Sequence, residues 1–339
     1  MDVRRIDPFD EELLTRFHDT CRRAELHERP WESIWSLAEL RARFEHPSGT
    51  ERSELFAAFD GAEIVGAALV DSPLEDNTDK AWMHAMVPPE HRRRGVGTLL
   101  VGHLAEVVRA DGRSVLLAES SYPFEARDEH PYRRFAERNG FVHDMAEIVR
   151  MLRLPVPAEV LDALAAEAAP HHGAYRLETF VGAVPDEYLP TYCQVHNQLA
   201  VDAPTGDVEF EEESLTPQEL RASEQRFAVA GTTRVSTVAV RGDHEVVAYT
   251  DLVVKADPAA RVQQWGTLVH RDHRGHRLGT AVKVANLRVL QERFPDRTEV
   301  VTSNAEVNRH MVDINDRLGF RAVAVLPCFR RALAGPDAS

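Results

Sequence analysis

The stretch that decides the fold is Met86-Val-Pro-Pro-Glu-His-Arg-Arg-Arg-Gly-Val-Gly-Thr98. An apolar run typical of a strand, Ala81 to Val87, ends at two prolines; basic residues and two glycines follow, and a helical pattern begins at Thr98. Gly95 and Gly97 allow a tight turn and a close approach of the backbone to a ligand, because they lack a Cβ atom. The unpaired N–H groups at the start of the helix, together with its dipole, favour a bound anion. The stretch therefore predicts a strand, a phosphate-binding turn and a helix.

Two other phosphate-binding motifs do not fit this turn. A Walker loop needs Gly-Lys followed by Ser or Thr, and the sequence has no such triplet here. A dinucleotide fingerprint needs a third glycine at the position that Leu100 occupies.

Length and composition narrow the class of protein. The 339 residues suggest about two domains, and 43% apolar with 28% charged residues is ordinary for a soluble globular chain. The net charge of 40 − 55 = −15 argues against nucleic acid as the main partner. Three scattered cysteines argue against a disulfide framework. With a charged N-terminus and no long apolar segment, we expect a cytoplasmic protein that does not enter a membrane.

The order of expected elements occurs twice. Glu63, Val87, Arg92 and Gly97 correspond to residues 182 positions later, namely Glu245, Val269, Arg274 and Gly279. The pair Gly140-Phe141 corresponds to Gly319-Phe320 at a spacing of 179. Four shared spacings are hard to explain by accident, so the sequence predicts a duplicated domain. We expect domains at 1–154 and 173–333, with a linker helix in 155–172 that begins after Pro155 and Pro157.

These residues resemble one family. A strand followed by Arg92-x-x-Gly95-x-Gly97 and a helix is similar to the acetyl-CoA loop of the GCN5-related N-acetyltransferases (GNAT). The late Gly-Phe pairs, and the segment from Ser303 to Phe320, resemble the end of the same family's domain. The resemblance covers nearly the whole chain, twice, as in tandem acetyltransferases of the mycothiol synthase type. It implies an α/β (α+β) fold with two tandem acyl-CoA N-acyltransferase domains, each a mixed sheet that splays between its fourth and fifth strands and is flanked by helices.

The resemblance also implies where acetyl-CoA, or another short acyl-CoA, would bind. The pantetheine arm would pair with the backbone of Met86 and Val87, or of Leu268 and Val269. The pyrophosphate would lie on one of two loops, made of Arg92, Arg93, Arg94, Gly95, Val96, Gly97 and Thr98, or of Arg274, Gly275, His276, Arg277, Leu278, Gly279 and Thr280. Arg93 or Arg94 would reach the 3′-phosphate through a charge-assisted contact.

The sequence departs from the family pattern in both halves. Arg277 stands at the first glycine position of the second loop, and we expect the nearby Gly275 to provide the flexibility. The tyrosine that commonly protonates the leaving thiolate in the family is replaced by Ala136 and by Asn315. Where the second half has the family's asparagine, Asn308, the first half has Glu129.

The surrounding asparagines favour the second half as the catalytic one. Candidate catalytic residues there are Asn304, Asn308 and Asn315. In the loop after its first helix, Asp202 or Asp207 could hold a cationic amine, although a helix end followed by a proline-glycine turn explains that loop equally well. Trp265 could shape the acceptor pocket, whereas the default for a strand aromatic is burial.

The first half would then bind acyl-CoA without turnover or act as a structural partner. Its own base candidates are His84 on the fourth strand, which more simply faces a neighbouring residue, and Glu119 at the end of the fifth strand.

The spacing His270-x-x-His273-x-x-His276 resembles that of metal ligands, but a strand-to-helix turn does not place these side chains on one face. The interleaved arginines would also repel a cation, so we expect no metal.

The leading hypothesis is an N-acetyltransferase that acts on the primary amine of a small molecule by direct attack in a ternary complex. A thioester is already activated, so the protein must mainly orient the amine, remove its proton and stabilise an oxyanion. The alternatives are a non-catalytic acyl-CoA-binding sensor and a protein-lysine acetyltransferase. We expect a monomer or homodimer; the sequence does not identify the amine.

Overall fold

The computed structural model describes residues 1–198, 210, 211 and 215–333, which form two compact units. Unit 1 comprises Met1–Glu147 and the chain from Ala324 onward, and unit 2 comprises the described residues between Ile148 and Val323. The two units are groups of residues that contact one another in space, and they are not continuous ranges of the sequence. The domain boundaries expected at 154 and 172 therefore stay a prediction.

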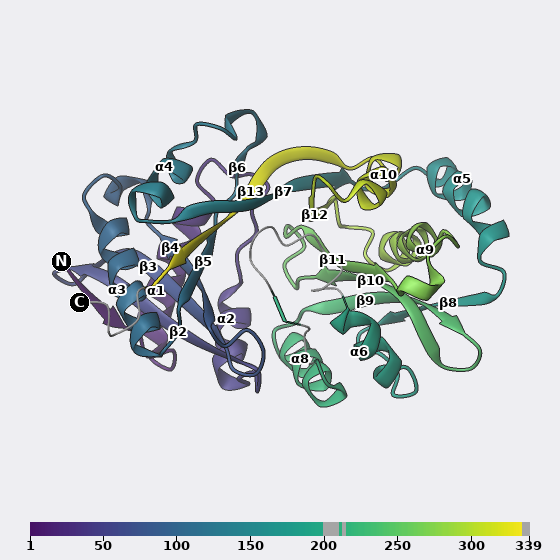
Figure 1. Ribbon diagram of the computed structural model, residues 1–339, viewed down its shortest axis with the longest axis horizontal. Helices are drawn as coiled ribbons and strands as arrows, with labels where there is room; N and C mark the ends of the chain where they lie inside the picture. The colour runs from purple at the N-terminus through teal and green to yellow at the C-terminus, as the bar shows by residue number, and fades with distance from the viewer. Residues whose placement is uncertain (199–209, 212–214, 334–339) are drawn as a thin grey trace. The chain divides into compact units, whose positions relative to one another are not determined.

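Unit 1 is a mixed sheet with helices on both faces (Figure 1). Its strands in spatial order are β1 (Asp2–Arg5), β2 (Glu51–Asp60), β3 (Glu63–Pro73), β4 (Lys80–Met86), β5 (Val115–Glu119) and β13 (Arg321–Ala332). Its helices are α1 (Glu11–Glu25), α2 (Leu37–Glu45), α3 (Val96–Ala110) and α4 (Pro131–Arg138). Strands β1 to β4 pair antiparallel, and β4 pairs parallel with β5.

The core of unit 1 has two layers because successive residues of a strand face opposite sides of the sheet. On β2, Leu55 and Phe59 pack in the cluster with Phe17 of α1, whereas Phe56 lies in the cluster with Leu100 of α3. Burying each such side chain contributes about 1.5–3 kcal/mol, so the two clusters hold α1 and α3 on opposite faces.

Unit 2 repeats this plan. Its strands in spatial order are β8 (Tyr175–Val181), β9 (Thr233–Arg241), β10 (Glu245–Val254), β11 (Val262–Val269), β12 (Glu299–Ala305) and β7 (Val142–Arg153), the last belonging to the unit from Ile148 onward. Its helices are α5 (Ala158–Ala168), α6 (Leu189–Asn197), α8 (Pro217–Val229), α9 (Leu278–Arg293) and α10 (Arg309–Leu318). On β9, Val238 packs in the cluster with α6 and Ala239 in the cluster with α9.

The predicted duplication is confirmed by the placement of the elements. Strands β3 and β10 begin 182 residues apart, at Glu63 and Glu245. The short 3-10 helices η1 (Pro89–His91) and η4 (Arg271–His273) have the same spacing, as do the starts of α3 and α9.

The closing strand of each sheet comes from the other half of the sequence. Residues Cys328–Ala332 of β13 pair antiparallel with Glu119–Val115 of β5, as Figure 1 shows for the yellow strand. Strand β7 lies beside β12, and the N–H of Leu154 donates to the carbonyl of Thr298 at 2.8 Å. The domains expected at 1–154 and 173–333 place each segment in its own half, because an apolar pattern identifies a strand without identifying its partner.

The described residues contain no helix with the length and apolarity that a membrane crossing demands. All three cysteines, Cys21, Cys193 and Cys328, are buried free thiols.

The exchanged strands lead to a test with a matched pair of substitutions. Phe329→Ala should destabilise unit 1 although the residue lies near the end of the chain, because Phe329 is 2% exposed within the core of α3. Phe320→Ala should destabilise unit 2, whose core contains that ring. Each loss should be about 3–5 kcal/mol. Native-state hydrogen exchange, read separately for residues 55–118 and 233–300, measures the loss of stability in each unit. Reduced protection of unit 2 alone in Phe329→Ala would contradict the assignment of Phe329 to the core of unit 1.

Candidate active site

The turn that is predicted to bind phosphate in unit 1 joins β4 to α3 through η1. Helix α3 begins at Val96, two residues before the predicted Thr98, because Gly95 caps it in the left-handed conformation with φ 83°. Arg93 is also left-handed, with φ 62°. The two left-handed residues curl the backbone so that the first-turn N–H groups of α3 point into the turn, as a phosphate cradle requires.

The turn of unit 2 has the same backbone with the residue types interchanged. Gly275 has φ 85° and Arg277 has φ 52°, and they lie 182 residues after Arg93 and Gly95. The expectation that Gly275 provides the flexibility is incomplete, because Arg277 itself adopts the left-handed conformation. A side chain there costs about 1–2 kcal/mol, so unit 2 retains the cradle at some expense.

The second glycine of each motif is required by packing. A Cβ atom at Gly97 would lie 2.9 Å from Cζ of Phe135, and one at Gly279 would lie 3.3 Å from Cδ1 of Ile314. The helices α4 and α10 therefore approach the starts of α3 and α9 closely.

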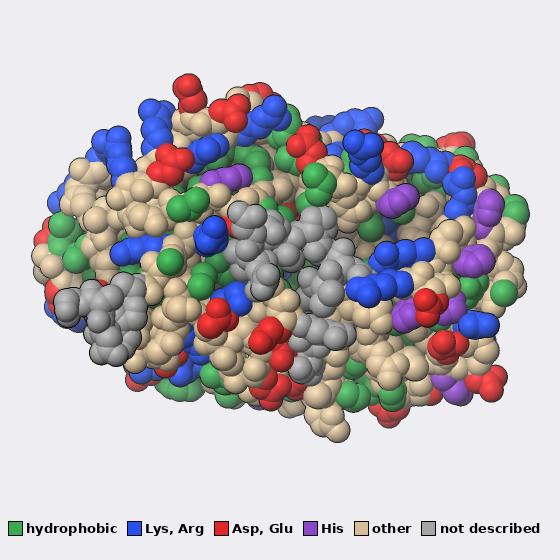
Figure 2. Space-filling model, in the orientation of Figure 1, with side chains coloured by type: hydrophobic (Ala, Val, Ile, Leu, Met, Phe, Trp, Pro, Cys, Tyr) green, Lys and Arg blue, Asp and Glu red, His purple; other side chains and the backbone are tan. Residues whose placement is uncertain are grey.

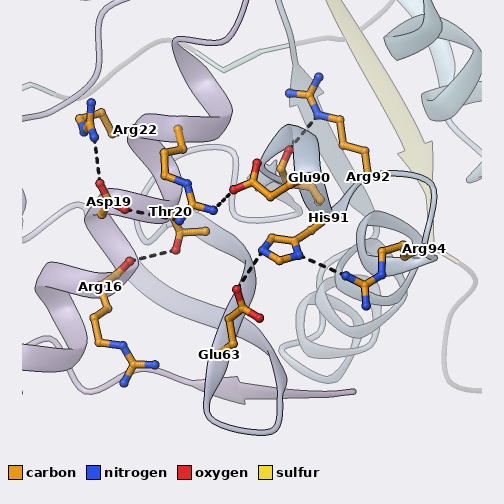
Figure 3. A network of polar contacts seen from close by, with 11 residues as sticks. Arg16, Asp19, Thr20, Arg22, Glu63, Glu90, His91, Arg92 and Arg94 are labelled. Atoms are coloured by element: carbon orange, nitrogen blue, oxygen red, sulfur yellow. Dashed lines mark hydrogen bonds and ion pairs between the residues drawn. The ribbon is translucent and has the colours of Figure 1, made fainter.

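Polar contacts engage most of the basic residues of the first cradle. Figure 3 shows His91 pointing toward Glu63 on one side and Arg94 on the other. The His91 Nε2 lies 3.3 Å from Glu63 Oε1, and Arg94 Nη1 lies 3.4 Å from His91 Nδ1. Arg92 donates from Nε to the Val87 carbonyl at 2.9 Å. Arg93 is exposed and has no hydrogen bond or ion pair with the described residues, so it is the arginine best placed to contact a phosphate.

A carboxylate of unit 2, Glu167, forms ion pairs with Arg277 of the second cradle and with Arg317 of α10. Glu167 of α5 accepts from the guanidinium groups of Arg277 and Arg317, and this holds the pKa of its carboxyl below the usual value. The His276 Nδ1 lies 3.1 Å from the carbonyl of His171. Arg277 is thus already paired with an anion, unlike Arg93.

The histidines of the second turn are held by separate contacts. His273 is buried, with Nδ1 3.0 Å from the hydroxyl of Tyr175, whereas His270 caps η4 through its own ring. Nowhere in the described ranges do three or more His, Cys, Asp or Glu residues converge as metal ligands would.

Both sheets splay where the family resemblance implies. In unit 1 the β4–β5 register runs from Lys80↔Val115 to Met83↔Ala118. In unit 2 the β11–β12 register covers Val262↔Val300 and Gln263↔Val301. Beyond these pairs, the predicted pantetheine contacts Met86, Val87, Leu268 and Val269 lie on the outgoing ends of β4 and β11. Their roles stay a prediction.

The registers also show which residues correspond at the splay. Lys80 and Val262 are 182 apart, so their partners Val115 and Val300 correspond. Four residues further along β5 and β12 stand Glu119 and Asn304, respectively. Unit 1 thus has a carboxylate where unit 2 has an amide, which is not basic at neutral pH.

Glu119 lies in an unusual electrostatic environment. The residue is exposed at the end of β5, yet enough protein surrounds its carboxylate for desolvation to raise its pKa. The negative charges of Glu147 and Glu32 add to the effect, and the pKa of Glu119 reaches about 7. A carboxylate with such a pKa can both take up and release a proton near neutral pH, which suits a general base.

His84, the other base candidate of unit 1, is less suitable. Burial, and then the charge of Arg43, lower its pKa to about 4, so the ring is a weak base. Its centroid lies 6.2 Å from that of Trp35 in an edge-on arrangement, in keeping with a strand histidine that faces a neighbouring residue.

The asparagines predicted to be catalytic in unit 2 have structural partners. Asn315 is fully buried and donates to Asn304 Oδ1 at 3.2 Å, while Asn304 donates to the carbonyl of Ala305 at 3.1 Å. Asn308 caps α10 by accepting from the N–H of Met311. Catalytic roles for these three residues stay predictions.

The two candidate substrate residues have different outcomes. Asp202, like Asp207, lies outside the described residues. Trp265 is 45% exposed, so burial in the core is wrong for this strand aromatic. Its ring lies edge-on to Phe227 at 5.5 Å, and its Nε1 donates to Gln263 at 3.2 Å.

Lys283 is a feature of unit 2 that the sequence analysis missed. It lies on α9, is 1% exposed, and donates to the Met311 sulfur at 3.9 Å, with Nζ 5.5 Å from the Phe320 centroid. Because neither partner is an anion, desolvation lowers the pKa of Lys283 to about 7. The available signal was the 182-residue spacing, which places this lysine at the position of the core residue Val101.

Replacing this lysine should stabilise unit 2. The pKa of Lys283 is about 7 in the folded chain and 10.5 ordinarily, so the folded state binds the proton less tightly than the unfolded chain. The free-energy cost of burying the charged lysine is full below pH 7 and disappears above about pH 10.5. Lys283→Met should therefore raise the free energy of unfolding by roughly 3–5 kcal/mol at pH 6 and far less at pH 10. Urea unfolding at both pH values measures this; an equal gain at both would contradict a buried charge. The reverse change in unit 1, Val101→Lys, should destabilise.

The raised pKa of Glu119 predicts the opposite pH dependence of stability: replacing this residue should stabilise the protein more at high pH than at low pH. A carboxyl with a folded-state pKa of about 7 and an ordinary value of 4.5 costs stability increasingly as pH rises through that window. Glu119→Gln should therefore raise the melting temperature more at pH 8 than at pH 5. Glu106→Gln, the same change at an exposed carboxylate of α3, is the control and should show no such trend. A larger gain at pH 5 would contradict the raised pKa.

Comparison with known proteins agrees with this geometry. Residues 22–141 match the Acetyltransferase (GNAT) family. No curated protein sequence matches the chain at a significant level. A tandem GNAT protein from the clavulanic acid biosynthesis pathway has a similar structure, with a TM-score of 0.78, 23% identity and 99% of each chain covered.

Two further solved structures have a similar fold. A GCN5-related N-acetyltransferase from Sphaerobacter thermophilus has a TM-score of 0.62 and 18% identity, covering 99% of this chain and 97% of its own. A glucosamine N-acetyltransferase region of a fungal multi-domain β-N-acetylglucosaminidase has a TM-score of 0.61 and 16% identity, covering 97% of this chain and 38% of its own. At these identities, the likeness concerns the fold.

The sequence match covers the cradle and splay of unit 1, and the structural likeness extends through both units. Residues 22–141 of unit 1 therefore match the GNAT family, and the likeness to the solved tandem structure shows the GNAT fold in both units.

Proposed function

We propose that the protein transfers an acetyl group from acetyl-CoA to the primary amine of a small molecule, by direct attack in a ternary complex. The family supports acyl-CoA-dependent acetyl transfer in general. We propose further that the transfer takes place in unit 1, which departs from the preference for the second half that the asparagines suggest.

One observation carries this assignment: Glu119 stands at the open end of the β4–β5 splay, where the corresponding residue of unit 2 is Asn304. An amine must lose a proton when it attacks a thioester, and Glu119 is a carboxylate with a pKa near 7. The Asn304 amide is committed to Asn315 and cannot perform this task.

The cradles support the same choice. In unit 1 the first-turn N–H groups of α3 and the exposed Arg93 would hold the phosphates of acetyl-CoA, which supplies the acetyl group as an activated thioester. In unit 2 Arg277 is engaged by Glu167. Unit 2 would then bind acyl-CoA weakly or support unit 1 structurally.

The neighbourhood of Glu119 also suits a cationic acceptor. Glu147 and Glu32 add negative charge near its carboxylate, and an incoming ammonium group would be attracted before it is deprotonated. On the face drawn in Figure 2, Lys and Arg side chains are interspersed with Asp and Glu, so positive charge does not form the broad basic face that nucleic acid would need.

The test is thiol release from acetyl-CoA with a panel of amines. Glu119→Gln should lower kcat/KM by about 10²-fold or more, because the proton acceptor is lost. Asn304→Ala in unit 2, checked for folding by circular dichroism, and Glu106→Gln in unit 1 should retain most of the activity.

The other outcomes discriminate between the alternatives. Loss of activity in Asn304→Ala but not in Glu119→Gln would place catalysis in unit 2. Acetyl-CoA binding without turnover of any amine would favour a sensor, and turnover of lysine peptides alone would favour a protein-lysine acetyltransferase.

A further inference from the structure

The segment between α1 and α2 is tied to the end of the splay by a buried chain of hydrogen bonds. Trp31 is 7% exposed and Ser121 1% exposed. The Trp31 indole Nε1 donates to Ser121 Oγ at 2.6 Å, and the Ser121 hydroxyl donates to Oε1 of Glu32. The three side chains thus connect the loop between α1 and α2 to the residues that follow β5.

The direction of this chain follows from its donors. An indole N–H can only donate, so the Ser121 oxygen must accept from Trp31. The single hydroxyl proton of Ser121 then points to Glu32, whose carboxylate accepts it.

A buried arginine holds the other side of the same loop. Arg29 is 6% exposed; it donates to Glu25 at 2.6 Å and has Nη1 3.8 Å from Glu32. Its guanidinium lies 5.7 Å from the centroid of Tyr132, and so does the guanidinium of the cradle residue Arg92. The arginine thus links the loop that carries Glu32 to the cradle.

The geometry brings Glu32 close to Glu119. Ser121 follows Glu119 by two residues, and an extended chain spans about 7 Å over that separation. Among the ionised groups, Glu147 from β7 and Glu32 from the loop act on the Glu119 carboxyl. The Cys328 thiol stands opposite in the β5–β13 register, and burial, followed by the charge of Glu119, raises its pKa to about 12, so it adds no charge. On β4, the charge of Glu32 also acts on the His84 ring and favours a higher pKa there, against the larger effect of burial.

We propose that Trp31 and Ser121 are positioning residues of the acetyl-transfer site, which hold the Glu32 carboxylate in a fixed place beside Glu119. This inference rests on the proposed function, because it assigns the base to Glu119. Glu32 acts through Glu119: its fixed negative charge keeps the base from becoming too acidic to accept a proton near neutral pH. It needs no contact with the acetyl group.

The consequence is a predictable shift in the pH dependence of kcat/KM. A like charge that acts on a carboxyl at a partly solvated site, as Glu32 acts on Glu119, shifts the pKa of that carboxyl by on the order of one pH unit. In Glu32→Gln, the acidic limb of the curve of kcat/KM against pH should therefore move about one pH unit lower. Ser121→Ala frees Glu32 from its anchor and should move the limb in the same direction by a smaller amount, as should Trp31→Phe.

Conservative and neighbouring variants provide the controls. Ser121→Thr keeps the hydroxyl and should restore the position of the limb. Glu28→Gln removes a carboxylate of the same loop whose side chain is 83% exposed, and it should leave the limb unchanged. Lower activity in Ser121→Ala and Glu32→Gln with an unchanged limb would overturn the proposal, since a purely structural role predicts that result.

A second measurement separates this inference from the proposed function. Carbon-detected NMR titration of the Glu119 carboxyl in the full chain, assigned by comparison with Glu119→Gln, follows its pKa without any substrate. A lower pKa in Glu32→Gln and Ser121→Ala supports the positioning role even if no amine in the panel is acetylated. An unchanged pKa overturns it. If Glu119→Gln remains fully active, the assignment of the acetyl transfer to unit 1 fails whatever the titration shows.

Discussion

Two parallel strands that separate after a few residue pairs create the opening on which the rest of unit 1 depends. Beyond Met83↔Ala118, the backbone of β4 is no longer covered by β5. Glu119 then lies at the end of β5, where desolvation and other carboxylates act on it. The cradle lies at the end of β4, so the same separation brings the proposed anion site and the proposed proton acceptor to one end of the sheet.

The two units show how one backbone supports different chemistry. Their cradles share left-handed residues at equivalent positions, with Arg and Gly interchanged. At the splay, Glu119 corresponds to Asn304, and in the core Val101 corresponds to Lys283. The fold tolerates each exchange because backbone pairing and apolar burial, rather than these side chains, hold the sheets together. Function can therefore be retained in one unit while the other diverges.

Unit 1 concentrates unfavourable electrostatics at the proposed site. Glu119, Glu147 and Glu32 raise the free energy of the folded chain at neutral pH, because like charges are brought together in partly desolvated surroundings. Such an arrangement persists only when the surrounding structure enforces it. The buried Trp31–Ser121 hydrogen bond and the Arg29 contacts provide that enforcement for Glu32. Destabilised charges of this kind are typical of sites where stability is exchanged for activity.

The sequence by itself determined the repeated order of elements, the duplication at 182 residues, both strand–turn–helix junctions and the resemblance to GNAT proteins. These are local or periodic properties: alternating apolar residues, glycines at tight turns and a repeated spacing. Only the tertiary structure decided that the closing strands are exchanged, that Trp265 is exposed, that Glu32 and Glu147 act on Glu119, and that Asn304 is bonded to Asn315. Each of these depends on residues distant in sequence, and apolar patterns carry no information about which distant residue supplies a strand, a charge or a hydrogen bond.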